Sequence, residues 1–344
     1  MMRTKLEITY GSYIRFFIVL IGLLFLYYMK DILVLLFLVI IIVAGLSPSV
    51  ERWAKYITRP GAVFAMFVLI FGLLGLMFSL IIPPLVDQIK EFSNDLPNIV
   101  QRLSTPENQS FIDKITNSIA DNLNTLSSKL TDVTGFVLTQ TLGVLSGLIA
   151  AITVIVLSFY FLLEEEGLRK IFKGVIPEGS QVGISETVKK ITVKLGAWLR
   201  GQLLLMLVVG VTTTIGLYIV GVPYPLTLGL WAGLTEIVPW LGPWLGAIPG
   251  VAVGFTQSPL TGILTLVVYL FVQQAESNLL VPRIMGKAVG LNPIVVLLAI
   301  LVGEKLYGIF GILLSVPMAA VISVIVEDWD TVTGTFQSIN KKAD

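Results

Sequence analysis

Two glutamates in strongly apolar surroundings are the residues best placed to do chemistry in this sequence. Glu236 lies in LTEIVPWLGPWLG, residues 234–246, which holds two prolines and two glycines but no Lys or Arg. Glu304 lies in a second apolar region, which is interrupted at Gly303–Lys305. An ionisable side chain at membrane depth typically marks a path for ions, protons or polar substrates. The two carboxyl groups are therefore candidates for binding a cation, a proton or the hydroxyl groups of a sugar-like solute.

The two glutamates occupy equivalent positions in an internal repeat. The spacing Pro-x10-Glu-x12-Pro occurs twice, 68 residues apart, and several apolar identities accompany it. The matched positions are Pro225, Glu236 and Pro249 in the first copy and Pro293, Glu304 and Pro317 in the second. Proline and glutamate are scarce in these regions, so the shared spacing is harder to obtain by chance than the apolar matches. The sequence predicts two similar units, 221–255 and 290–326.

The first unit contains two apolar segments that are too short to cross a bilayer separately, and the second unit is likewise interrupted, between 294–302 and 306–326. In the first unit they are 226–238 and 244–255, whereas a spanning helix needs about 20 residues. A broken helix leaves backbone N–H and C=O groups unpaired, which lipid tolerates only where they are buried in protein or line an aqueous site. Paired interrupted segments are the best sequence pointer to the binding site of a transporter. We expect two re-entrant helical hairpins; the alternative makes 226–255 a full span.

The residues that should shape the hairpin tips and hinges are mainly prolines and glycines. They are Pro239, Gly242, Pro243, Pro249, Gly303, Lys305, Gly308, Gly311 and Pro317. The glycines and Pro317 are expected to serve backbone geometry and close helix approach. Three tryptophans near the first break, Trp231, Trp240 and Trp244, are expected to pack or to anchor at an interface rather than to stack on a ligand. Glu304 has a plainer alternative role, an ion pair with Lys305.

A polar cluster precedes the basic segment PRIMGK. It consists of Gln273, Gln274, Glu276 and Asn278. The i, i+4 pair Gln274–Asn278 and the i, i+3 pair Gln273–Glu276 should each share a helix face. The cluster could line the transport path together with the two hairpin glutamates, or it could be ordinary interfacial polarity. Gln202 is a weaker candidate for the same path.

Composition limits the classes of function that remain. Of the 344 residues, 55% are hydrophobic and 13% are charged, whereas soluble domains carry about 25% charged residues. The net charge of +1 gives no reason to expect nucleic acid as a partner. The chain has no Cys and no His, which excludes disulfides, thiol catalysis, His-based metal sites and the Ser-His-Asp triad. We expect an integral membrane protein that is not an enzyme, with no cofactor and no metal site.

The pattern predicts an all-α fold of six full transmembrane helices plus two inverted re-entrant hairpins, or eight spans if the hairpins are counted. The expected spans are 16–29, 32–46, 62–82, 142–163, 203–220 and 260–281. Basic residues gather in 47–61, 164–200 and 282–287, which the positive-inside rule places in the cytoplasm. A non-transporting scaffold is the remaining alternative, but it would not explain the repeated broken helices.

The segment 85–140 should form an extracellular amphipathic helical hairpin. Its apolar residues recur at alternating spacings of three and four, and residues 87–140 carry a net charge of −3. Pro83–Pro84 should kink the preceding helix where it leaves the bilayer. The chain then divides into transmembrane helices 1–84, the external hairpin 85–140, a fourth span with its loop 141–200, a transport region 201–328 and a tail 329–344.

The transport region also resembles a known family. The resemblance rests on the first unit and on the stretch that follows it, QQAESNLLVPRIMGKAVGLNPIVVLLAILVGEKLYGIFGILLSVPMAAV. The region is similar to the signature of the autoinducer-2 exporter family, and the similarity is specific from about Tyr160 to Val321. Two positions depart from many relatives, Asn292 in place of His and Glu304–Lys305 in place of small residues. The substrate of a relative therefore does not transfer simply to this chain.

What the resemblance implies is a multi-pass permease of the bacterial inner membrane with both termini in the cytoplasm. It implies a homo-oligomer, for which a pentamer is a possible form, and an elevator-type movement of the two hairpins. The implied activity is export of a small polar organic solute such as autoinducer-2. The alternative is Na⁺(Li⁺)/H⁺ antiport through the intramembrane glutamates.

Overall fold

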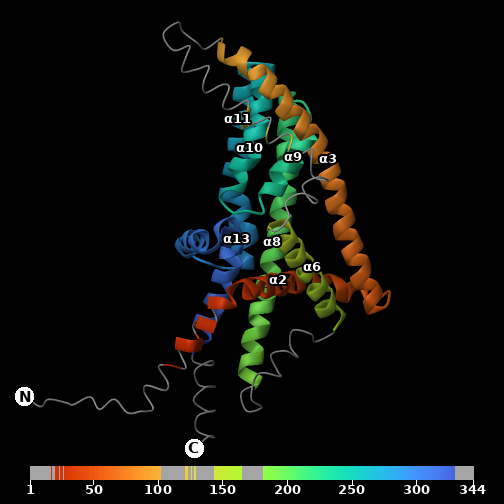
Figure 1. Cartoon of the computed structure of the whole chain (residues 1–344), viewed down its shortest axis with the longest axis vertical. Helices are drawn as coiled ribbons and strands as arrows, with labels where there is room; N and C mark the ends of the chain where they lie inside the picture. The colour runs from red at the N-terminus through yellow and green to blue at the C-terminus, as the bar shows by residue number, and fades with distance from the viewer. Residues whose placement is uncertain are drawn as a thin grey trace, which may run out of the picture.

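A computed structural model describes residues 27–101, 143–164 and 181–329, together with isolated positions in 17–25 and 121–128. All regular elements in these ranges are helices, and Figure 1 shows their arrangement. They are α2 (Lys30–Trp53), α3 (Arg59–Gln101), α6 (Gly143–Leu163), α8 (Gln181–Val220), α9 (Pro225–Thr235), α10 (Gly242–Gln257), α11 (Pro259–Ala275), the π-helix η2 (Glu276–Leu280), α12 (Val281–Ala288) and α13 (Pro293–Glu327). The predicted all-α class is confirmed for this part of the chain.

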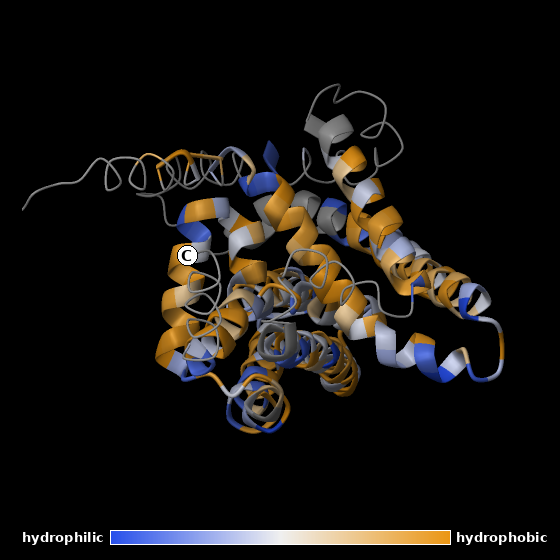
Figure 2. Ribbon diagram, turned by 90° about the horizontal axis from the view of Figure 1, so that it is seen from below, coloured by the Kyte–Doolittle hydropathy of each residue, from blue (hydrophilic) through white to orange (hydrophobic). Residues whose placement is uncertain are grey.

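Several of these helices are suited to a bilayer. Among the described residues, five are long and apolar enough to cross a membrane, and a shorter apolar helix covers Gly147–Leu163. The five are Lys30–Trp53, Arg59–Gln88, Ser185–Val220, Pro259–Gly286 and Pro293–Glu327. Large apolar side chains such as Phe64, Leu207 and Phe271 are exposed. Figure 2 shows that apolar residues predominate along most of the helices. The chain is a multi-pass membrane protein; its span count of six stays a prediction.

Three helices extend beyond the apolar segments that the sequence predicts. α2 continues through Pro48 to Trp53, and α8 begins at Gln181, so parts of the expected loops 47–61 and 164–200 are helical. α3 continues through Pro83–Pro84 to Gln101. Lys, Arg and Glu are good helix formers, so a helix does not have to end where its apolar stretch ends. The remainder of the predicted external hairpin lies largely outside the described residues.

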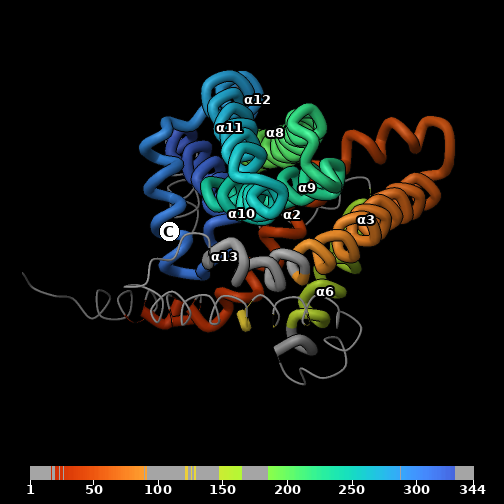
Figure 3. Tube along the Cα trace, turned by 90° about the horizontal axis from the view of Figure 1, so that it is seen from above, coloured from red at the N-terminus to blue at the C-terminus, as the bar shows by residue number. Residues whose placement is uncertain are grey.

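The long helix α8 is the element on which the others assemble. Its first half packs with α2, α12 and α13 around Leu195 and Trp198. Its second half packs with α9 and α11 around Leu217. Figure 3 shows α8 to α11 grouped together, with α3 and α6 to one side. A separate apolar cluster joins α2, α3 and α6. Both halves of the repeat therefore rest on one helix.

Prolines within the helices leave backbone carbonyls that neighbouring helices satisfy. Pro84 has no N–H for the carbonyl of Leu80, and the hydroxyl of Thr227 donates to that oxygen over 3.3 Å. Pro249 likewise frees the carbonyl of Leu245, and Nε1 of Trp231 on α9 donates to that oxygen over 2.9 Å. These bonds fix α3 against α9 and α9 against α10, because an unpaired carbonyl in an apolar interior is costly.

The α8–α9 contact depends on glycines that bring two backbones together. A Cβ placed on Gly233 would lie 2.5 Å from the carbonyl oxygen of Met206 and 3.1 Å from Cα of Gly210. Neither of these neighbours is a side chain that could rotate away. Any larger residue at position 233 must push the helices apart.

Gly233→Ala is expected to destabilise the protein by about 1–3 kcal/mol, since overpacking against backbone forces a helix shift. Thermal unfolding of the purified protein, followed by tryptophan fluorescence in detergent, should show a lower midpoint. Gly72→Ala on α3 is the control, because nothing lies within 4 Å of its added Cβ. Equal midpoints for the two variants would contradict a tight α8–α9 contact.

Candidate functional site

The first repeat unit forms a helix–turn–helix whose turn contains Glu236. α9 ends at Thr235 and α10 begins at Gly242, so the interruption predicted within 234–246 is present. The turn is tight: a Cβ on Gly242 would collide with the carbonyl oxygen of Thr235, and Trp240 has a φ of 72°. Pro243 follows at the start of α10, a position where its missing N–H costs nothing.

Two glutamates meet at this turn. Glu236 and Glu276 are 4% and 6% exposed, and their carboxyl groups lie close enough to interact with each other. As a carboxylate, Glu236 has no donor for its buried Oε2 atom among the described residues. A hydrogen bond between two carboxyl groups requires a proton on one of them, because two adjacent negative charges repel strongly in a medium of low polarity. Such an arrangement can chemically hold one shared proton, or a cation in its place.

Glu276 reaches this position at a change in helix type. The α-helix α11 ends at Ala275, and Glu276 opens the five-residue π-helix η2. The N–H of Val281 bonds to the carbonyl of Glu276 five residues back, and Pro282 follows with no N–H to restore the usual pattern. Such π-bulges are frequent at functional sites because they turn one side chain out of helical register.

Gln202 holds the backbone at the same turn. Its Nε2 donates to the carbonyl oxygen of Glu236 over 2.7 Å, and its side chain is buried. The C-terminal carbonyls of a helix lack intrahelical partners, so an amide from α8 satisfies one of them. From the sequence, Gln202 was only a weak candidate for the transport path. Its signal was a lone amide at the start of an apolar run, with nothing to connect it to a turn 34 residues away.

Two amides of the polar cluster, Gln274 and Asn278, lie on an exposed face of the helix. Nδ2 of Asn278 donates to Oε1 of Gln274 over 2.9 Å, so the predicted i, i+4 pair does share a face, but that face is exposed. Gln273 is half-buried and donates to Ser277 over 3.3 Å. Of the cluster, Glu276 alone contacts Glu236. Roles for the other three in substrate binding remain predictions.

The second unit also reverses direction, but not at the predicted break. α13 is continuous through Gly303–Lys305, and the non-helical residue is Gly308, with φ 58° and ψ −135°. Only glycine adopts this conformation readily, which explains why the reversal falls there. Gly303 and Gly311 then lie in direct backbone contact across the turn. Glu304 is exposed, and the carboxyl group that interacts with Glu236 is that of Glu276.

The remaining residues that the sequence singled out differ in burial and in their contacts. Nε1 of Trp231 donates over 2.9 Å to the carbonyl of Leu245, the group freed by Pro249, so this tryptophan packs as expected. Trp240 and Trp244 are exposed, as is Lys305. Pro239 lies in the turn, and Pro317 is fully buried within α13. Asn292 caps α13 by accepting a bond from the N–H of Ile294 at 2.9 Å.

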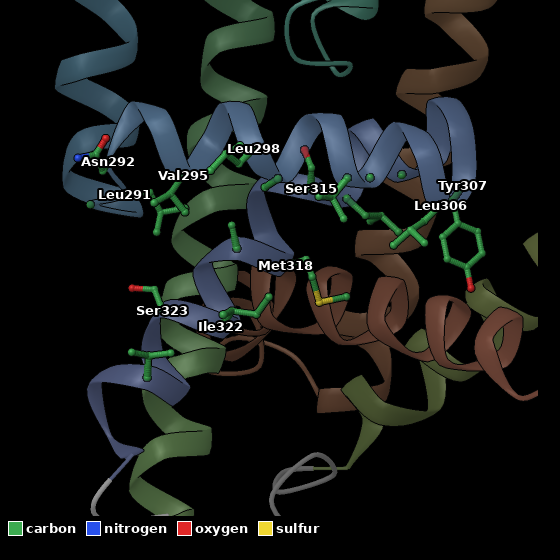
Figure 4. Close-up of a pocket in the computed structure, with 18 of the residues that line it drawn as sticks. Leu291, Asn292, Val295, Leu298, Leu306, Tyr307, Ser315, Met318, Ile322 and Ser323 are labelled. Atoms are coloured by element: carbon green, nitrogen blue, oxygen red, sulfur yellow. The ribbon is translucent and has the colours of Figure 1, made fainter. Parts of the chain in front are cut away.

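A cavity of about 660 Å³ lies along α13. Figure 4 shows Asn292 at one end and Tyr307 at the other, with Met318 and Ile322 on the second part of the helix facing the same space. Most of its lining side chains are aliphatic, and Glu236 is not among them. The far end of α13 is attached to α8 by Lys190–Asp328 at 2.8 Å and Lys194–Glu327 at 3.6 Å.

Comparison with known proteins decides the family. A family model described as AI-2E family transporter matches residues 16–331. The chain belongs to the AI-2E transporter family. The resemblance seen in the sequence is confirmed.

Curated relatives of this AI-2E protein agree with that assignment. YueF and YrrI, candidate transport proteins of Bacillus subtilis, are each 30% identical to it, over 292 and 296 residues. These alignments cover 80% of this chain and 78% of YueF, and 83% of both chains for YrrI. PerM, a candidate permease of Escherichia coli, is 25% identical over 295 residues, or 82% of each chain. The protein is a membrane transporter by family.

Gln202→Ala is expected to lower the stability of this AI-2E protein by about 1–3 kcal/mol, because the buried carbonyl of Glu236 loses its donor. The measurement is the thermal midpoint of the purified protein. Gln274→Ala removes an amide from an exposed face and should leave the midpoint nearly unchanged. A Gln202→Ala midpoint equal to that of the wild type would mean that the amide does not hold the turn.

Proposed function

We propose that this AI-2E family member is a proton-coupled secondary transporter and that Glu236–Glu276 is its coupling site. The supporting observation is a pair of buried carboxyl groups that lie close enough to interact, at the turn of a broken helix. No Lys or Arg among the described residues forms a salt bridge with either of them. A pair neutralised by a basic partner would be structural, whereas this pair depends on a proton or a cation for its neutrality.

The chemistry of the pair gives a mechanism for coupling. With one proton present, the carboxyl groups share it and the turn is closed around Glu276. When the proton leaves, two like charges face each other in a site with little water, and they separate or attract a cation. A proton and a monovalent cation then compete for the same oxygens, which is what an antiporter needs. Gln202 keeps the turn in place by binding the Glu236 backbone rather than its side chain.

Two cargoes are compatible with this site. We favour Na⁺ or Li⁺ because carboxylate oxygens are hard ligands. When the pair has lost its proton, one monovalent cation can offset the negative charge that the proton had neutralised. The second candidate is export of a small polar organic solute such as autoinducer-2, driven by the proton. The family description supports that candidate. The mainly aliphatic cavity along α13 does not favour a very polar cargo.

The movement that we propose is an elevator-type displacement of two re-entrant hairpins, α9–α10 and the two parts of α13. The supporting observation is that both hairpins are attached to α8. The first is attached through the backbone contact at Gly233, and the second through the ion pairs Lys190–Asp328 and Lys194–Glu327. We further propose inverted orientation of the two hairpins, a homo-oligomer that could be a pentamer, and an inner-membrane location with cytoplasmic termini. Family membership and the repeat are the grounds for these proposals.

The test uses liposomes that hold the purified protein and a pH-sensitive dye. A pulse of Na⁺ or Li⁺ across an imposed pH gradient should change the internal pH, since each cation that enters the site displaces a proton. Glu236→Gln and Glu276→Gln should each abolish the response. Glu304→Gln is the matched control, because its carboxyl group is exposed and outside the pair.

The outcomes distinguish the two candidate cargoes, and they distinguish a coupling site at Glu236–Glu276 from one at Glu304. A cation response that survives in Glu236→Gln and Glu276→Gln would overturn the proposed coupling site. Loss of the response in Glu304→Gln alone would indicate that the coupling site lies in the second hairpin, at Glu304. No cation response from sealed, folded wild-type protein would exclude antiport and leave solute export as the activity to test.

A further inference from the structure

The cavity along α13 is chemically different from the carboxyl pair. Leu298, Val302 and Leu306 line it and are more than half exposed, and Met318 and Ile322 face them from the second part of the helix. Apolar side chains that surround an open cavity in a membrane protein favour an apolar ligand body over a hydrated one. The volume of about 660 Å³ falls within the roughly 300–1,000 Å³ that is usual for small-molecule sites.

One cation stands beside the Tyr307 end of this cavity. Nζ of Lys30 lies 5.7 Å from the centre of the Tyr307 ring and 5.0 Å from that of Tyr27. Tyr307 lines the cavity, and so does Val34, one helical turn beyond Lys30. No carboxylate among the described residues forms a salt bridge with Lys30. Asp31 follows Lys30 in the sequence and its charge also acts on Tyr307, but no salt bridge joins Asp31 to Lys30 among the described residues.

The other end of the cavity carries charge that is already balanced. Glu327 lines it, but Oε1 accepts a bond from Ser323 at 2.6 Å and lies 3.6 Å from Nζ of Lys194. The amide of Asn292 is engaged as the cap of α13. Among the described residues, the ammonium of Lys30 is the cation that stands against the Tyr307 ring, and the faces of two aromatic rings are its contacts there.

We propose that this cavity binds a single-chain amphiphile with an anionic head, of the long-chain carboxylate type. The hydrocarbon chain lies between the two parts of α13, where each buried methylene adds to affinity. The carboxylate head lies at Lys30, beside the ring of Tyr307. Figure 4 shows Tyr307 at this end of the cavity. A neutral chain has no partner for the ammonium, and a polar solute leaves the aliphatic walls without contacts. Binding here does not depend on the proposed coupling at Glu236 and Glu276.

Photolabelling of the full-length protein in lipid nanodiscs tests the site. The probes are a diazirine-bearing palmitate and the diazirine-bearing alcohol of the same chain length, and mass spectrometry maps the labelled residues. Palmitate should label the cavity residues Leu298 and Met318 above the level at Phe64 and Val68, which face outward on α3. It should exceed the alcohol in the cavity by about tenfold, the worth of a hydrogen bond to a charged group.

Matched variants distinguish the contribution of the Lys30 charge to labelling from the contribution of the cavity. Lys30→Gln should remove the preference for palmitate over the alcohol. Lys305→Gln, which changes an exposed cation of α13 two residues before Tyr307, should keep it. Leu298→Trp should fill the cavity and reduce labelling by both probes. Leu301→Trp is its control, because Leu301 is 54% exposed, as Leu298 is 55% exposed, but does not line the cavity.

Three results would overturn the proposal. They are cavity labelling no higher than on α3, equal labelling by acid and alcohol in the wild type, and loss of the preference in Lys305→Gln to the same degree as in Lys30→Gln. Glu236→Gln should label as the wild type does, even if it has lost cation transport. Failure of the coupling site and failure of the amphiphile site are therefore distinguished by separate measurements.

Discussion

An apolar interior requires a partner for every backbone polar group that a broken helix sets free. This protein breaks or kinks its helices repeatedly, and neighbouring helices supply the missing donors. The indole of Trp231 reaches the carbonyl freed by Pro249, the hydroxyl of Thr227 reaches the one freed by Pro84, and the amide of Gln202 reaches the carbonyl at the turn. These bonds cross between elements, so each one also fixes a helix against its neighbour. The packing of α3, α8, α9 and α10 follows from meeting this requirement.

The carboxyl pair is a consequence of the same turn. Because α9 stops at Thr235, Glu236 is directed away from its own helix and toward α11. The π-helix turns Glu276 into the same space, while the amides around it stay on an exposed face. The site thus combines two local departures from α-helical geometry, one on each side. Its protonation is linked to the geometry of the turn, since the two carboxyl groups cannot both be charged and remain in contact.

Sequence reasoning could predict the interruption at 234–246 because proline, glycine and glutamate are conspicuous in an apolar run. It could not identify the partner of Glu236. Repeat symmetry favoured Glu304, but the partner is set by how α11 packs against the turn and by a change of helix type that has no strong sequence signal. The role of Gln202 depends on the position of α8, which spacing alone does not give.

The lengths of helices show the same limit. Hydropathy located the apolar parts of α2 and α8 well, yet both helices continue into charged sequence. The reversal within α13 falls at Gly308 rather than at the polar residues before it, because backbone conformation and not polarity determines where that chain can turn.

The central claim is that Glu236 and Glu276 share one proton that a cation can displace. Infrared difference spectroscopy of the full-length protein, with and without Na⁺, measures this directly through the carbonyl band of a protonated carboxylic acid. The account predicts that such a band is lost on addition of Na⁺ and that the change is missing in both Glu236→Gln and Glu276→Gln. A difference spectrum with no carboxylic acid band in the wild type, or with the same band in both variants, would contradict it.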